Sequence, residues 1–113
     1  MVNDIDQTIS ALADPIRRQV VEHLRHGSHR ASELADLVGV SRPGLSRHLR
    51  VLRRSGIVQV TISDADARER FYELRPERFL ALQAWLDQVQ AFWEDQLSSF
   101  QKHASETRTD KTP

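Results

Sequence analysis

Two short amphipathic segments joined through a glycine constrain the fold more than any other feature of this sequence. Residues 31–38 place apolar side chains on one helical face, and Gly39 follows directly after them. Ser41 can cap a second helix, 41–55, whose first turn accepts Pro43. Two short helices that meet in a tight glycine-containing turn are typical of a helix-turn-helix.

The rest of the chain adds three predicted helices and two predicted strands. The helices are expected at residues 5–13, from Pro15 to about His26 and from Pro76 onward, and the strands at 57–62 and 70–74. The polar segment 63–70 between the strands is the predicted hairpin tip, or wing. We therefore predict a mainly α fold with a small β-hairpin, a winged helix-turn-helix in the order α-α-α-α-β-β-α.

The length of 113 residues fits one small domain with one compact core. We expect residues 1–104 to form a single DNA-binding and dimerisation domain, and residues 105–113 to be a disordered tail. The acidic first residues lack the pattern of a signal peptide and no segment is apolar enough to span a membrane, so a cytoplasmic location is expected. The absence of cysteine excludes disulfides and thiolate metal sites.

The charges are unevenly distributed along the chain, although the formal net charge is zero. Residues 17–54 contain nine arginines against three acids. The stretch 41–54 contains no acid at all, so the salt bridges of an ordinary charged helix surface cannot form within it. An arginine face of this kind on the second helix of a helix-turn-helix favours DNA as the partner over simple solvation.

Helical geometry turns the arginines of this second helix outward when Leu45, Leu49 and Leu52 face the core. Together with the wing, this face supplies the candidate DNA-binding residues: Ser41, Arg42, Pro43, Ser46, Arg47, His48, Arg50, Arg53, Arg54, Arg68 and Arg70. Side chains in the first turns of such a helix read base edges, whereas later ones contact phosphates. We therefore predict that Arg42, Ser46 and Arg47 read bases and that the arginines after them bind phosphates.

Two of these candidates have alternatives or limits. His48 lies between the core face and the outward face, so it contacts a phosphate or forms a hydrogen bond within the fold. Arg68 and Arg70 flank a tip that contains three acids, which oppose deep insertion into a DNA groove. We expect the wing to make only a supporting contact.

Three segments, ALADPIRRQVVEHL, ASELADLVGVSRPGLSRHLRVLRRSGIV and ERFYEL, together resemble the ArsR family of bacterial winged-helix regulators. The resemblance covers roughly residues 5–100, and the chain is most similar to cysteine-free, autorepressor-like members. It implies a homodimer whose first and last helices form the interface and whose two recognition helices read a palindromic operator, usually with repression as the outcome.

The interface that this resemblance implies consists of the apolar residues of the first and last helices: Ile5, Ile9, Leu12, Phe79, Leu82, Leu86, Val89, Trp93, Leu97 and Phe100. Family metal sensors carry a cysteine pair in the helix of residues 31–38, or spaced Asp and His ligands in the last helix. Neither set is present, since Val89 stands where a histidine ligand would follow Asp87. No metal and no cofactor are therefore predicted.

Three other functions are alternatives to DNA binding without an effector. His23 and His26 stand at a spacing that can hold a metal, although histidines near a helix C-terminus are also favoured by the helix dipole. The aromatic residues of the last helix can bind a small apolar effector, but packing is their commoner use. A protein adaptor that binds an acidic partner is the third alternative. An enzyme is not expected, because no nucleophile, base and orienting group cluster in the sequence.

Overall fold

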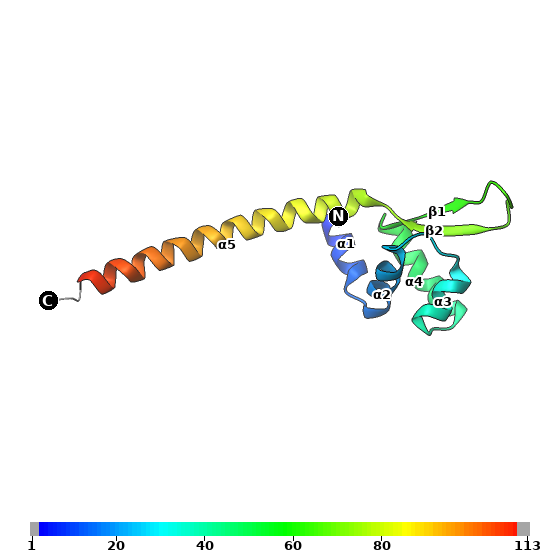
Figure 1. Cartoon of the computed structure of the whole chain (residues 1–113), viewed down its shortest axis with the longest axis horizontal. Helices are drawn as coiled ribbons and strands as arrows, with labels where there is room; N and C mark the ends of the chain where they lie inside the picture. Colours follow the sequence, from blue (N-terminus) through cyan, green and yellow to red (C-terminus); the bar gives the residue numbers. More distant parts are fainter. Residues whose placement is uncertain (1–2, 111–113) are drawn as a thin grey trace. The chain divides into compact units, whose positions relative to one another are not determined.

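The computed structural model describes residues 3–110, with side chains described for residues 3–106. Figure 1 shows the elements in chain order: α1 Asp4–Leu12, α2 Pro15–Leu24, α3 Ala31–Val38, α4 Arg42–Arg54, β1 Val58–Ile62, β2 Arg70–Leu74 and α5 Pro76–Asp110. The predicted order of elements is confirmed. Backbone contacts divide the chain into two compact units, Met1–Ala81 and Leu82–Pro113, and the single domain expected over residues 1–104 stays a prediction.

Polar side chains fix the starts of the helices that frame the predicted motif. The Asp14 carboxylate accepts hydrogen bonds from the amides of Ile16 at 2.8 Å and Arg17 at 3.2 Å at the start of α2. The Ser41 hydroxyl accepts from the amide of Gly44 at 3.2 Å at the start of α4. These caps satisfy amides that have no partner within the helix, and they begin each helix where the sequence predicted.

Gly39 makes the turn of the helix-turn-helix. It adopts a left-handed conformation with φ of +78°, which favours glycine, and its amide donates to the carbonyl of Ala35 at 2.9 Å. The amide of Val40 donates to the same carbonyl at 3.2 Å. The chain thereby leaves α3 and enters α4 within three residues.

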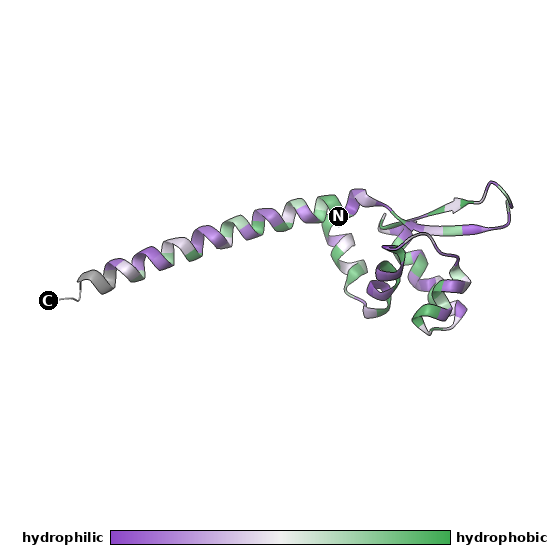
Figure 2. Ribbon diagram, in the orientation of Figure 1, coloured by the Kyte–Doolittle hydropathy of each residue, from purple (hydrophilic) through white to green (hydrophobic). Residues whose placement is uncertain are grey.

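The core of the first unit gathers one apolar face from each of α2, α3 and α4 under the hairpin. Its largest fully buried apolar side chains are Val20, Leu34, Leu45, Leu52 and Ile57. Figure 2 shows these helices with hydrophobic and hydrophilic residues alternating along each ribbon, as the 3.6-residue period requires. The face of α4 opposite this core is left at the surface.

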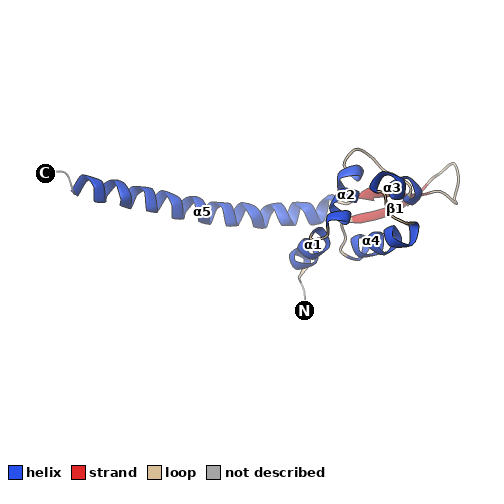
Figure 3. Ribbon diagram, turned by 90° about the horizontal axis from the view of Figure 1, so that it is seen from below, coloured by secondary structure: helices blue, strands red, loops and turns tan. Residues whose placement is uncertain are grey.

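The hairpin pairs β1 and β2 antiparallel, with Val58 opposite Leu74 and Ile62 opposite Arg70. Figure 3 shows its strands beside α2, α3 and α4, where α4 contacts β1 and both α2 and α3 contact β2. The loop before α3 adds a single bridge: His29 and Tyr72 exchange backbone hydrogen bonds of 3.1 and 2.8 Å. The sequence analysis did not predict this bridge, which fixes the backbone of Tyr72 to the start of the helix-turn-helix.

Helix α5 continues without a break into the second unit and as far as Asp110. Residues 105–110 are thus helical, whereas a disordered tail was expected from residue 105; residues 111–113 lie outside the described residues. No glycine or proline lies between Pro76 and Pro113, so nothing in the sequence interrupts the helix. No helix among the described residues is both long and apolar enough to cross a membrane.

Candidate DNA-binding surface

Helix α4 has one buried face and one exposed face. Leu45, Leu49 and Leu52 are at most 2% exposed. The residues predicted on the opposite side are all exposed: Ser41, Arg42, Pro43, Ser46, Arg47, Arg50, Arg53 and Arg54. The prediction of which side chains face outward is confirmed, while their contact with DNA stays a prediction.

The described arginines divide into two groups by their partners. One group forms hydrogen bonds or ion pairs with carboxylates or backbone carbonyls within the chain: Arg17, Arg18, Arg25, Arg30, Arg75 and Arg78. In the other group no side chain has an ion-pair or hydrogen-bond partner among the described residues: Arg42, Arg47, Arg50, Arg53, Arg54, Arg68 and Arg70. The second group consists of the arginines of α4 and of the predicted wing. Their guanidinium groups are available to an external anion without the loss of an internal contact.

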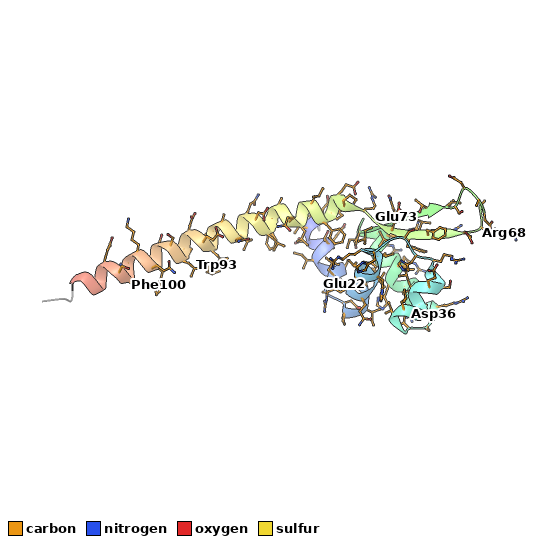
Figure 4. The ribbon with its side chains drawn as sticks, in the orientation of Figure 1. Glu22, Asp36, Arg68, Glu73, Trp93 and Phe100 are labelled. Carbon is orange, nitrogen blue, oxygen red and sulfur yellow. The ribbon has the colours of Figure 1, made fainter. Side chains whose placement is uncertain are left out.

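The wing carries Arg68 at its tip, as Figure 4 shows. The Asp66 carboxylate accepts a hydrogen bond from the amide of Arg68 at 3.0 Å and so shapes the turn. The Glu69 carboxylate lies 3.3 Å from the guanidinium of Arg30. Of the three acids expected to oppose deep insertion, Asp66 shapes the turn and Glu69 pairs with Arg30. Only Asp64 has no such contact within the described residues.

Arg30 joins the base of the wing to the start of α3. Its Nε donates to Glu33 Oε1 at 2.9 Å, and its Nη1 reaches Glu69 across 39 residues of sequence. Its guanidinium carbon also lies 6.0 Å from the centroid of the Phe71 ring. The side-chain hydrogen bond from Arg30 lowers the pKa of the Glu33 carboxyl below its ordinary value. The wing is thereby attached to the helix-turn-helix through one side chain.

Arg17 connects the end of α1 to α4. Its Nε donates to the carbonyl of Ala11 at 2.6 Å, its Nη2 donates to that of Ser10 at 3.3 Å, and its Nη1 lies 3.4 Å from Nδ1 of His48. As a hydrogen bond, this contact requires Nδ1 of His48 to accept, because a guanidinium only donates. Of the two roles weighed for His48, the hydrogen bond within the fold is present. The amide of Arg17 also donates to the capping carboxylate of Asp14. This hydrogen bond is the largest cause of the lowered pKa of the Asp14 carboxyl.

The interface residues predicted on α1 differ in their exposure. Ile9 is 43% exposed, Ile5 is half-buried, and Leu12 packs against the core of its own unit. Phe79, at the start of α5, also packs against that core. Leu12 and Phe79 thus have partners within the chain, and Ile9 is left without a covering side chain.

The part of α5 in the second unit exposes most of its apolar residues. Among the predicted interface residues, Leu82 and Val89 are half-buried, and the exposed fractions of Leu86, Trp93, Leu97 and Phe100 are 45%, 58%, 57% and 71%. Trp85 and Phe92 are exposed as well, at 39% and 57%, and they widen the apolar face beyond the predicted residues. The Phe92 and Trp93 rings meet edge to face with centroids 5.6 Å apart. Figure 4 shows Trp93 and Phe100 projecting from this helix.

The two candidate metal-binding histidines lie close to the end of α2. His23 is in its last turn, and His26 follows the end of the helix by two residues. In the described part of the chain, no three His, Asp or Glu side chains gather in a group that could hold a metal ion. His23 and His26 therefore lack a third such ligand among the described residues of the protomer, and metal sensing through them stays an untested hypothesis.

Comparison with known proteins places these features in a family. Residues 14–60 match the sequence profile described as "Bacterial regulatory protein, arsR family". The HTH-type transcriptional regulator Rv2034 of Mycobacterium tuberculosis is 40% identical over 96 residues, which cover 84% of this chain and 83% of that protein. Among solved structures, the ArsR family transcriptional regulator RHA00566 has a TM-score of 0.72 and 33% identity, covering 81% of this chain and 98% of its own. The transcriptional repressor BigR from Xylella fastidiosa has a TM-score of 0.59 and 30% identity, covering 73% and 82%.

The profile match contains α2, α3 and α4, the elements that build the helix-turn-helix and its arginine face. The similarity to Rv2034 and RHA00566 extends over more than four fifths of this chain. Fold, element order and sequence therefore agree over more than four fifths of the chain, and this chain belongs to the ArsR family of bacterial transcriptional regulators.

Proposed function

We propose that this protein is a homodimeric repressor that binds a palindromic DNA operator through α4 and the wing at 63–70. The observation that carries the proposal is the division of the arginines: those of α4 and the wing are the ones without partners among the described residues. Unpaired cations on one exposed helix and one hairpin tip match the phosphates on either side of a DNA groove.

Helix α4 enters the major groove in this proposal. Its first turns carry Arg42, Ser46 and Arg47, whose side chains read base edges, and Arg47 lies nearly opposite the buried leucines at about 100° per residue. Arg50, Arg53 and Arg54 contact phosphates. The wing places Arg68 and Arg70 on the neighbouring backbone, and the Arg30–Glu69 pair holds it there.

Two protomers associate through α1 and α5. Ile9 on α1 and the exposed apolar residues of α5 are surfaces that water disfavours and that a second copy can cover. A dimer carries two recognition helices, which suits two half-sites about one helical turn apart. Occupation of the operator by the dimer blocks transcription, as the name of the repressor BigR suggests for that relative.

Selection of bound sequences from random double-stranded DNA by the full-length protein tests the proposal. We expect an inverted repeat to emerge, with binding that weakens steeply as salt rises because arginines displace counterions. A large ratio of specific to nonspecific affinity supports a regulator. Salt-dependent binding without any sequence preference overturns the proposal and favours a protein adaptor that recognises acidic surfaces.

A further inference from the structure

Two cavities meet along one flank of α4, on the side that faces the hairpin. One has a volume of about 440 Å³ and the other about 270 Å³, and Ser46, Leu49 and Tyr72 line both. We call the combined hollow the Tyr72 groove. It runs from the end of α4, where Arg53 and Arg54 line it, to the start of α3, where Ser32 lines it.

Tyr72 is held firmly in this groove. Its backbone exchanges two hydrogen bonds with His29, and its side chain packs against the apolar core. Its hydroxyl has no hydrogen-bond partner among the described residues, although half-buried tyrosines usually find one. Tyr72 thus lines the groove with a hydroxyl that has no partner among the described residues.

The groove combines a cationic rim with an apolar floor. Four arginines, Arg42, Arg50, Arg53 and Arg54, line the two cavities, and no acidic residue lines either of them. Leu45 and Leu49 contribute apolar side chains below the rim. Alternating anionic and apolar groups fit such a surface, and the sugar–phosphate backbone of DNA has this alternation.

The groove also lies where a DNA backbone would pass. When α4 occupies the major groove, a sugar–phosphate strand borders it on each flank, because the major groove is only about 12 Å wide. The Tyr72 groove occupies one of these flanks, beside the residues expected to read bases.

We propose that the Tyr72 groove binds the sugar–phosphate backbone of one operator strand, with the Tyr72 hydroxyl donating to a phosphate oxygen. This inference rests on the proposed DNA-binding function and adds a contact that the sequence analysis did not include. Free small phosphates share the same chemistry, so the experiment below separates them from DNA.

The test compares full-length wild-type protein with Tyr72→Phe, which removes the hydroxyl and keeps the ring in the core. Thr61→Val is the matched control, since it removes a hydroxyl from the other strand, outside the groove. Affinity is measured on the selected operator and on unrelated duplexes. It is also measured on operators in which one phosphate at a time is replaced by an uncharged methylphosphonate.

We expect Tyr72→Phe to weaken binding about three- to tenfold on every sequence, with an unchanged salt slope because no charge is lost. The loss should disappear on the operator whose contacted phosphate is already neutral, as a double-mutant cycle requires for a direct contact. Thr61→Val should bind as wild type. An unchanged affinity for Tyr72→Phe, or an equal loss on every methylphosphonate operator, overturns the inference.

The second arm titrates DNA-free protein with a nucleoside monophosphate and follows amide shifts of the groove residues by NMR. Saturable millimolar or tighter binding that depends on Tyr72, together with full DNA affinity in Tyr72→Phe, assigns the groove to a small phosphate and overturns the proposal. If wild-type protein binds no DNA, the proposed function fails as a whole. If it binds and Tyr72→Phe binds equally well, only this inference fails.

Discussion

Arg47 lies in the first turns of α4, on the side turned away from Leu45 and Leu49, and its guanidinium has no partner among the described residues. In the proposed complex this position faces the floor of the major groove, where arginine can pair with guanine edges. Arg53 lies farther along the same helix and lines the Tyr72 groove. The two arginines have the same charge, so any difference between the effects of their replacement on DNA binding comes from their positions on the helix.

Replacement of each arginine by alanine should therefore have a different signature. Arg47→Ala should cost ~1–3 kcal/mol of operator affinity and relax the preference at one base position. Arg53→Ala should weaken all DNA sequences alike and reduce the salt slope by about one. Binding measurements across single-base operator variants and several salt concentrations separate the two. Identical behaviour of both variants would show that the division into base-reading and phosphate-binding residues is wrong.

The second prediction for a single residue concerns the carboxyl of Asp14 and the stability of the fold. Backbone hydrogen bonds, the one from Arg17 foremost, lower the pKa of its carboxyl below the ordinary value of 3.8. A carboxyl whose pKa is lower in the folded state contributes stability above its unfolded pKa and loses that contribution as the pH falls through its folded pKa. Asp14→Asn, which keeps a capping oxygen but no charge, should therefore be less stable than wild type near neutral pH.

The difference in the free energy of unfolding between the two proteins should shrink as the pH falls through the ordinary carboxyl pKa of 3.8 and on through the lower folded pKa. Urea denaturation followed by circular dichroism at several pH values measures it. Asn3→Asp is a useful comparison because it adds a carboxylate at the start of α1. The Asn3 side chain already caps that helix by accepting a hydrogen bond from the amide of Asp6. A wild-type advantage that stays constant down to the lowest pH would contradict the role of the Asp14 charge.

The helices, strands and turns were predictable where their causes are local. Asp14, Ser41 and Gly39 start or stop helices through contacts within four residues, so the sequence shows their role directly. The bridge between His29 and Tyr72 joins residues 43 positions apart and leaves no periodic pattern. The same holds for the Arg17–His48 contact, which spans 31 residues. The arginine face of α4 was therefore foreseen, and the Tyr72 groove beside it was not.

Two glycines at the ends of α3 and α4 provide a matched pair at the scale of elements. Gly39 and Gly56 have φ of +78° and +74°, and an added Cβ would be strained at either. At Gly39 nothing lies within 4 Å of that Cβ, whereas at Gly56 it would approach Nε of Arg78 to 2.7 Å. Arg78 pairs with Asp4, so its displacement also disturbs the attachment of α1.

Gly39→Ala should therefore destabilise the protein by ~1 kcal/mol through backbone strain alone. Gly56→Ala should cost more, because the Arg78 side chain must also move. Combining Gly56→Ala with Arg78→Ala should bring the cost of the glycine substitution back to that of Gly39→Ala, after correction for Arg78→Ala alone. Thermal unfolding of the wild type, the three single variants and the double variant measures these costs. Equal costs for the two single glycine variants would mean that the Arg78 side chain moves aside without a measurable loss of stability.

The second unit contains no core of its own among the described residues. From Leu82 on, α5 is a single helix whose larger apolar side chains are exposed or half-buried. Its sequence predicted the apolar positions through their spacing but not the length of the helix, because the polar composition after residue 104 suggested disorder. Helix formation past this point costs only small increments of propensity when no proline or glycine intervenes. The exposed apolar face of this helix is disfavoured in water, which favours a partner that covers it.

We expect that partner to be a second copy, and charge placed on the apolar face of α5 should separate the two protomers. Leu86→Asp with Trp93→Asp adds two carboxylates seven residues apart on this face, whereas Ala84→Asp with Ala91→Asp adds the same charges at the same spacing on the opposite side. The first pair should yield a less stable monomer that loses at least tenfold (~1.4 kcal/mol) in operator affinity, because one recognition helix reads only one half-site. The second pair should remain dimeric and bind DNA as wild type. Sedimentation equilibrium and operator titration of both variants measure these outcomes, and a wild-type monomer at micromolar concentration would rule the dimer out.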